Sequence, residues 1–142
     1  MRKVTNILDR KGNRLITVLP SISVIDALKL MAENNIGCVV VALEDRFLGI
    51  MTERDYSRKV ILKGRSSTDT RVEEIMSSDF PTVSPNDSIE YCMQLLSANN
   101  LRYLPVMTAG KLQGVISIND VVTETIISQE DTISHLQSYI AS

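Results

Sequence analysis

Two short stretches of the sequence place a hydroxyl three residues before a carboxylate, directly after an apolar run. The first motif is Gly-Ile-Met-Thr-Glu-Arg-Asp at residues 49–55, and the second is Gly-Val-Ile-Ser-Ile-Asn-Asp at residues 114–120. This spacing is typical of a helix N-terminus, where the two side chains satisfy backbone N–H groups that lack a helical partner. A carboxylate can also accept hydrogen bonds from the two hydroxyls of a ribose, and a hydroxyl beside free N–H groups suits a phosphate. Each motif could therefore be a helix cap or part of a nucleotide site.

For a single motif of this kind the helix cap is the more common interpretation, and we assign Ser23-x-x-Asp26 as a plain cap. Two features favour ligand binding over a plain helix cap at Asp55 and Asp120. Both follow Gly-x-x at the end of a predicted strand, where a helix N-terminus would face a crevice. Both are aspartate, whereas the reciprocal capping box prefers the longer Glu or Gln.

Other kinds of chemistry have little support in the sequence. The one histidine, His135, has no Cys or His neighbour, so we expect a surface residue and no metal site. Cys38 and Cys92 lie in apolar patterns without CxxC spacing, which predicts reduced thiols in a cytosolic protein. The net charge of −2 gives no reason to expect binding to nucleic acid or an anionic membrane. We find no apolar run long enough for a membrane helix and no export signal.

The chain contains an internal repeat. Residues 15–56 align without a gap on residues 80–121, at a constant offset of 65. The identical pairs are Thr17/Thr82, Val18/Val83, Pro20/Pro85, Ser23/Ser88, Leu30/Leu95, Asn34/Asn99, Asn35/Asn100, Val41/Val106, Gly49/Gly114 and Asp55/Asp120. Most other positions keep their polarity, so the chain carries two copies of one unit.

Each copy predicts the element order β-α-β-β-α. A short strand ends at a proline, and a helix capped by Ser23 or Ser88 follows and ends at Asn-Asn. Two strands joined by a turn then lead into Thr52 or Ser117 and a second helix. Residues 4–8 and 72–76 resemble each other and predict a lead-in turn or short helix before each copy. We place the two repeats at residues 1–66 and 67–142, joined by the polar linker 63–70.

These residues resemble the tandem CBS-domain pair, or Bateman module. The matching motifs are T-V-x-P, N-x-I-G-x-V-V-V, G-I-M-T-E-R-D, R-Y-L-P-V and G-V-I-S-I-N-D, in this order. The resemblance covers nearly the whole chain. The sequence is similar to family members that have no attached catalytic domain. It implies an α/β (α+β) fold in which two β-α-β-β-α repeats pack sheet to sheet with pseudo-twofold symmetry.

The resemblance also implies a function. Similar modules are regulatory sensors that bind AMP, ADP, ATP, NAD(H) or S-adenosylmethionine in clefts between the repeats, and they commonly form homodimers. We therefore expect an adenine nucleotide ligand, no catalytic cofactor, no enzymatic activity and an unidentified protein partner. The dimer would form through helices at 55–62 and 120–127, with 133–140 packing at an edge. The alternative is a dimeric scaffold whose clefts no longer bind ligand.

By resemblance, the site residues divide between two clefts. One cleft takes Thr17, Ile22, Tyr103, Pro105, Val115, Ser117, Asn119 and Asp120. The other takes Thr82, Asp87, Gly37, Cys38, Ile50, Thr52, Arg54, Asp55 and Arg58. The aspartates would hold ribose, the Ser or Thr hydroxyl would lie near phosphate, and the adenine would lie near the threonines. With this resemblance included, we favour binding over capping at Asp55 and Asp120, although these residues can serve both purposes.

For three groups of these predicted site residues, the sequence allows a second interpretation. Arg54 and Arg58 are either phosphate ligands or a solvated basic face. Tyr103 either stacks on a base or fills core, and many relatives have histidine there. Thr17 and Thr82 are equally explained by the preference of threonine for strands.

Overall fold

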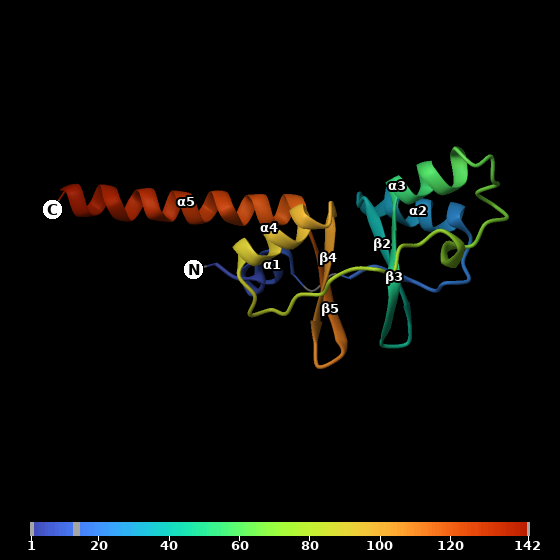
Figure 1. Cartoon of the computed structure of the whole chain (residues 1–142), viewed down its shortest axis with the longest axis horizontal. Coiled ribbons are helices and arrows are strands. Elements are labelled where there is room, and N and C mark those ends of the chain that lie inside the picture. The colour runs from blue at the N-terminus through green and yellow to red at the C-terminus, as the bar shows by residue number, and fades with distance from the viewer. Residues whose placement is uncertain (1, 13–14, 142) are drawn as a thin grey trace. The chain divides into compact units, whose positions relative to one another are not determined.

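The computed structural model describes residues 2–12 and 15–141. The chain forms two compact units, which we describe separately (Figure 1). One unit is Leu15–Phe80. The other combines the N-terminal helix α1 (Val4–Lys11) with the chain from Pro81 onwards.

The 15–80 unit contains a three-stranded sheet, two α-helices and two short helical turns. Its elements are β1 (Thr17–Val18), α2 (Val24–Asn34), β2 (Cys38–Leu43), β3 (Arg46–Thr52), α3 (Glu53–Tyr56), the π-helical turn η1 (Ser57–Ile61) and the 3-10 turn η2 (Val72–Glu74). Strand β1 pairs in parallel with β2, and β2 pairs antiparallel with β3. The parallel pair requires a crossover connection, which α2 supplies.

The other unit repeats this order. Its elements after α1 are α4 (Ile89–Ala98), β4 (Tyr103–Thr108), β5 (Lys111–Ser117) and the 24-residue helix α5 (Ile118–Ala141). Strands β4 and β5 form an antiparallel pair, and Val83 bridges in parallel to Val106 where β1 stands in the first copy. The α/β fold with two copies of one unit is thus confirmed.

The predicted helix signals have their expected geometry. The Ser23 hydroxyl accepts a hydrogen bond from the backbone N–H of Asp26 at 3.2 Å, and Ser88 accepts one from Tyr91 at 3.1 Å. Asn35 and Asn100 adopt positive φ angles of 53° and 51°, the left-handed conformation that ends a helix. Local side-chain chemistry therefore sets both ends of α2 and α4.

The lead-in segment of each copy packs on the other copy. The backbone N–H of Val4 donates to the carbonyl of Asp87 at 2.9 Å, and the N–H of Val72 donates to the carbonyl of Ile22 at 3.0 Å. These bonds are equivalent, because residues 22 and 87 are related by the repeat offset. The predicted division into 1–66 and 67–142 follows the duplication of the sequence, whereas the packing units exchange the two lead-in segments.

The two hydrophobic cores use equivalent positions. In the 15–80 unit the core includes Val18, Val24, Ala27, Met31, Val39, Val41, Met51, Val72 and Ile75. In the other unit the corresponding residues, in the same order, are Val83, Ile89, Cys92, Leu96, Leu104, Val106, Ile116, Val4 and Ile7. The apolar pattern of the repeat therefore builds the same core twice, and each lead-in segment completes the core on which it packs.

Cys92 is fully buried at the position that alanine occupies in the first copy. Burial, reinforced by the charge of Asp87, raises the pKa of its thiol from 9.0 to about 11. The reactive thiolate at pH 8 is then about a hundredfold scarcer than for an unperturbed thiol. We expect Cys92 in a Cys38→Ser variant to resist a thiol reagent at pH 8 until urea unfolds the protein. Labelling of the native variant at the rate of a free thiol would contradict this burial.

The helices after the two motifs differ from their predicted bounds. The first begins at Glu53 and changes to π-helical geometry at Ser57, whereas 55–62 was predicted as one helix. The second is one helix from Ile118 to Ala141, so the predicted segments 120–127 and 133–140 are continuous. No helix within the described residues is long and apolar enough to cross a membrane.

Candidate functional site

The first motif forms a complete capping box at the start of α3. The backbone N–H of Thr52 donates to Asp55 Oδ2 at 3.0 Å, and the N–H of Asp55 donates to Thr52 Oγ1 at 3.0 Å. The Thr52 hydroxyl also donates to Asp55 Oδ2 at 3.1 Å. Aspartate is therefore long enough to close the reciprocal box, and our sequence argument that its short side chain disfavours capping was wrong.

The second oxygen of the Asp55 carboxylate is also occupied. Its Oδ1 accepts a hydrogen bond from Ser77 Oγ at 3.0 Å and lies 3.1 Å from the ammonium of Lys59. The residue is only 7% exposed. A carboxylate offers about four acceptor positions, so the donors from Thr52, Ser77 and Lys59 use all of them. A ribose could bind this carboxylate only by displacing or sharing one of these donors.

The second motif has the same cap but a less occupied carboxylate. The N–H of Ser117 donates to Asp120 Oδ2 at 2.8 Å, and the N–H of Asp120 donates to Ser117 Oγ at 3.1 Å. Lys11, in the last turn of α1, contacts the same Oδ2 at 2.8 Å and the carbonyl of Val115 at 3.1 Å. Within the described residues, no hydrogen bond reaches Asp120 Oδ1. The two aspartates therefore differ in their capacity for a further partner.

Several predicted site residues of the 15–80 unit lie close to the first motif. Cys38 is the pairing partner of Thr52, and the N–H of Glu53 donates to the carbonyl of Gly37 at 3.3 Å. The structure thus gathers Gly37, Cys38, Thr52 and Asp55 where β2 begins and β3 ends. Ile50 is buried, and its backbone N–H and C=O both pair with Ser77.

The remaining predicted residues of this unit lie on its surface or at a turn. Arg54 and Arg58 are exposed, whereas Lys59 and Arg65 of the same basic run pair with Asp55 and Glu74. Exposure of the two arginines is compatible with either of their predicted roles. Thr17 is exposed on β1, and Ile22 is half-buried.

The other unit brings its predicted residues together in the equivalent place. Tyr103 pairs with Ser117, and Pro105 pairs with Val115, so both pairs lie on the β4–β5 hairpin that leads into Asp120. Asn119 lies within the motif itself and is exposed. The other two predicted residues lie elsewhere: Thr82 is exposed, and Asp87 uses its Oδ2 to accept the backbone N–H of Ser84 at 2.7 Å. The last bond gives Asp87 a role in its turn.

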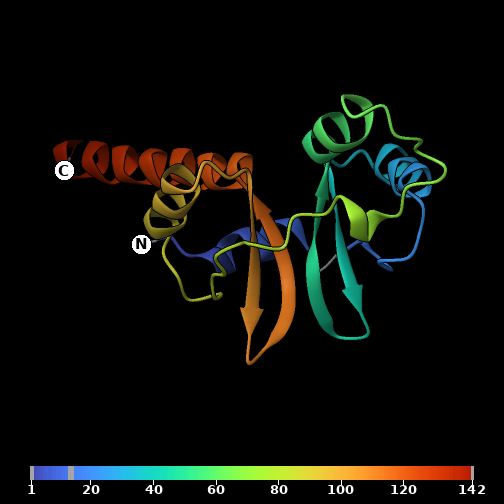
Figure 2. The ribbon, with the colours of Figure 1, turned by 45° about the vertical axis from the view of Figure 1, so that its right-hand side comes forward.

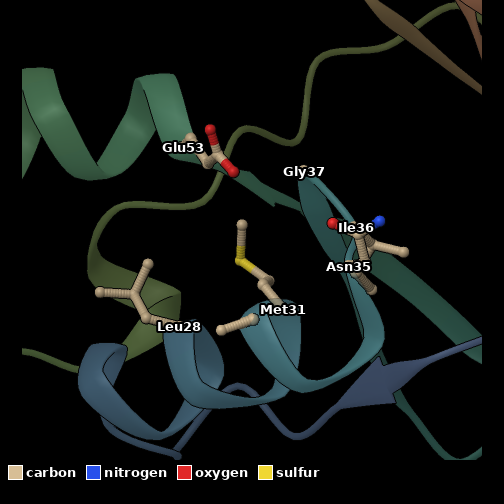
Figure 3. Close-up of a pocket in the computed structure, with 7 residues that line it drawn as sticks. Leu28, Met31, Asn35, Ile36, Gly37 and Glu53 are labelled. Atoms are coloured by element: carbon tan, nitrogen blue, oxygen red, sulfur yellow. The ribbon is translucent and has the colours of Figure 1, made fainter.

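A cavity of about 280 Å³ opens between the C-terminal end of α2 and the start of α3. Figure 3 shows the side chains of Leu28, Met31 and Glu53 around this space. Its lining residues are Leu28, Met31, Ala32, Asn35, Ile36, Gly37 and Glu53. Of these, only Gly37 was a predicted site residue. The lining residues on α2, Leu28, Met31 and Ala32, were not predicted, because the apolar spacing of that helix indicates packing as readily as a binding surface.

Comparison with known protein families identifies the family to which this chain belongs. The CBS domain model matches residues 5–61 and 72–136, which are the two copies of the repeat. The chain belongs to the CBS domain family. The match covers most of the sequence and includes both capped motifs.

Three similar proteins match most of this chain, which spans less than two thirds of the length of the first of them. The mitochondrial CBS domain-containing protein CBSX3 of Arabidopsis thaliana is 37% identical over 123 residues; the match covers 83% of this chain and 60% of that protein. A solved structure from Burkholderia ambifaria, assigned to signal transduction, is 46% identical with a TM-score of 0.85, covering 90% and 96% of the two chains. The CBS domain structure NE2398 is 39% identical with a TM-score of 0.84, covering 89% and 99%. The name of the plant relative gives a mitochondrial location. A cytosolic location for this chain therefore stays a prediction.

Two further matches show the range of proteins in which this module occurs. An inosine-5'-monophosphate dehydrogenase from Thermoplasma acidophilum is 31% identical over 108 residues, which are 75% of this chain but 21% of that enzyme. A hexameric CBS-CP12 protein from bloom-forming cyanobacteria is 31% identical with a TM-score of 0.75, covering 85% and 66% of the two chains. CBS pairs therefore occur within an enzyme and within an oligomer.

Proposed function

We propose that this protein is a regulatory module that binds an adenosine-containing ligand, AMP, ADP, ATP or NAD(H), and catalyses no reaction itself. The observation that carries this proposal is the duplicated motif. In each copy a hydroxyl and a carboxylate meet at the start of a helix, directly after a strand. This combination offers an acceptor for ribose hydroxyls and donors for phosphate, and membership of the CBS domain family supports the same function.

The two sites are unequal, and the Asp120 site is the stronger candidate. None of the described residues donates to its Oδ1, so this oxygen can accept a ribose hydroxyl, and its side chain is 15% exposed. The ammonium of Lys11 lies 2.8 Å from Oδ2 and brings positive charge to the edge of the site. Occupation of this site requires no donor to leave, so we expect it to bind ligand more tightly than the Asp55 site.

The Asp55 site also supports a second candidate function. Because its carboxylate is saturated by donors within the chain, this motif acts as a structural cap in the absence of ligand. A protein in which both motifs served only this purpose would be a dimeric scaffold with vestigial clefts. Asp120 Oδ1, to which no residue in the described part of the chain donates a hydrogen bond, is the feature that favours the sensor over the scaffold.

We also propose that the protein is a homodimer that regulates a partner protein. Large apolar side chains on the helical segments after both motifs are exposed, including Ile61 at 54%, Leu62 at 76% and Ile126 at 49%. Exposed apolar surface of this kind marks protein interfaces. A ligand could then act by changing the surface that the partner contacts, provided that it binds two conformations with different affinity.

Native mass spectrometry of freshly purified protein tests this function. We expect a species of twice 15.8 kDa that retains the mass of an adenosine-containing molecule. A titration with AMP, ADP, ATP and NAD(H) should restore that mass after ligand has been removed. A protein that binds none of these molecules at millimolar concentration would contradict the sensor and leave the scaffold.

A further inference from the structure

Helix α5 carries an apolar stripe that its own unit leaves exposed. The stripe, here called the α5 seam, consists of Val122, Ile126, Gln129, Ile133, Leu136 and Ile140. Its apolar members are 41%, 49%, 53%, 57% and 82% exposed, in chain order. The packed face of the same helix carries Val121 and Glu124, which are 0% and 1% exposed. The seam is therefore a second face of α5, distinct from the one that completes the core.

The seam extends beyond the body of its unit. Both views show the C-terminal half of α5 running past α1 and α4 (Figures 1 and 2). Every side chain described from residue 129 onwards is exposed. The acidic residues nearer the body have partners within the chain: Arg2 and Arg10 pair with Glu124, and Arg2 also reaches Asp131. The α1 segment thus fixes the base of α5 and leaves the seam uncovered.

The spacing of the seam specifies its partner as another helix. Its members alternate steps of four and three residues from 122 to 140. This is the 3.5-residue repeat of a coiled coil, in which the two alternating positions face the partner helix. The seam spans about 27 Å at 1.5 Å per residue. Binding of an irregular peptide or a flat sheet would not require apolar residues at a 3.5-residue repeat.

We propose that the α5 seam pairs in parallel and in register with the α5 seam of a second copy of this chain. Gln129 is the one polar member of the seam, and a polar residue at such a position fixes register by meeting a like partner. In a parallel pair it meets the second Gln129. An antiparallel pair centred on the seam would instead place it against Ile133.

The residues flanking the seam also suit a second copy. Thr125, Thr132 and Gln137 are neutral, and Glu130 is the charged residue among these flanking positions. In the parallel pair Glu130 lies beside Thr125 of the second copy, whereas the antiparallel pair would bring two Glu130 side chains together. Neutral flanks give no charge by which a different helix would be selected. A closed twofold pair is the ordinary outcome for such a self-complementary surface.

This inference rests on the proposed homodimer and locates one of its contacts, and it is independent of ligand binding. Disulfide cross-linking tests it in the full chain carrying Cys38→Ser, which leaves the buried Cys92. Leu136→Cys places a thiol on the seam, and Ser134→Cys places one on the same helix outside it. Both positions are exposed, so neither change should affect folding. We expect Leu136→Cys to give a disulfide-linked dimer about tenfold faster than Ser134→Cys under mild oxidation, because pairing raises the effective concentration.

Equal rates of cross-linking for the two variants would overturn the proposal. So would efficient cross-linking of position 122 to position 140 in a Val122→Cys, Ile140→Cys variant, because that link requires antiparallel helices. Light scattering on the parent protein separates the two proposals. If the protein is a dimer but Leu136→Cys does not cross-link it, the homodimer proposal stands and the pairing of the α5 seams is refuted. A 15.8 kDa monomer would refute both proposals.

Discussion

Alanine at Gly49 is expected to destabilise the protein by about 2–3 kcal/mol, and alanine at the equivalent Gly114 by about 1 kcal/mol or less. A Cβ atom at Gly49 would lie 2.7 Å from the backbone carbonyl oxygen of Ser77 and 3.1 Å from the sulfur of Met76. At Gly114 the nearest atom is Leu8 Cδ2, at 3.2 Å. The first clash is with backbone, which cannot move without loss of other contacts, whereas a leucine side chain can rotate.

The backbone near Gly49 is fixed by a pair of hydrogen bonds. Ile50 and Ser77 exchange N–H to C=O bonds of 2.9 Å in both directions. An added methyl group must push these two segments apart, so Gly49→Ala should weaken both bonds and the Ser77 contact to Asp55. Urea denaturation of the two alanine variants against the parent measures the difference. Equal losses of free energy of unfolding would show that the close approach of the lead-in segment at Gly49 is not a constraint.

Asp55→Ala should lower the free energy of unfolding by about 2–4 kcal/mol even without ligand. The substitution removes the acceptor of the Thr52, Ser77 and Lys59 donors from a site where Asp55 is 7% exposed. Unpaired buried donors cost about 1–3 kcal/mol, and loss of a cap adds about 1 kcal/mol. Urea denaturation measures the change.

The matched control is Asp26→Ala at the start of α2. There the Ser23 hydroxyl accepts the backbone N–H of residue 26, so the cap survives the substitution. We expect a loss of about 0.3–1 kcal/mol from the helix dipole alone. If Asp55→Ala lowers the free energy of unfolding no more than Asp26→Ala does, the four donors around Asp55 contribute nothing to stability. The Asp55 carboxylate would then be a weaker cap than its hydrogen bonds indicate.

The repeat allowed much of the fold to be predicted from sequence. A constant offset of 65 relates ten identical residue pairs, which include the Ser23 and Ser88 caps and the glycines Gly49 and Gly114. Apolar spacing and local capping chemistry are properties of a short segment, so they can be recognised without knowledge of tertiary contacts. The element order and the ends of α2 and α4 followed from these signals alone.

The partners of the motifs could not be predicted in the same way. Ser77 and Lys11 come from the segments that the two copies exchange, and nothing in a local pattern indicates on which copy such a segment packs. The equivalent residues Lys59 and Glu124 illustrate the consequence. Lys59 pairs with the motif carboxylate Asp55, whereas Glu124 is buried and pairs with Arg2 and Arg10 of the N-terminal segment. The full occupation of the Asp55 carboxylate, and the Oδ1 of Asp120 that no described residue contacts, depend on these tertiary contacts.

Thermal unfolding with and without ligand distinguishes motif aspartates that bind the ribose of an adenosine-containing ligand from aspartates that only cap helices. Asp55→Asn and Asp120→Asn keep a side-chain oxygen for the caps and remove the carboxylate charge. A ligand at 100 times its Kd adds about 2.7 kcal/mol to the stability of the folded protein. We expect AMP, ADP, ATP or NAD(H) to raise the Tm of the parent protein and of Asp26→Ala, to raise that of Asp120→Asn much less, and to leave that of the double variant unchanged. A double variant that responds as strongly as the parent, or a parent that responds to none of these ligands, would contradict ribose binding and leave both aspartates as helix caps.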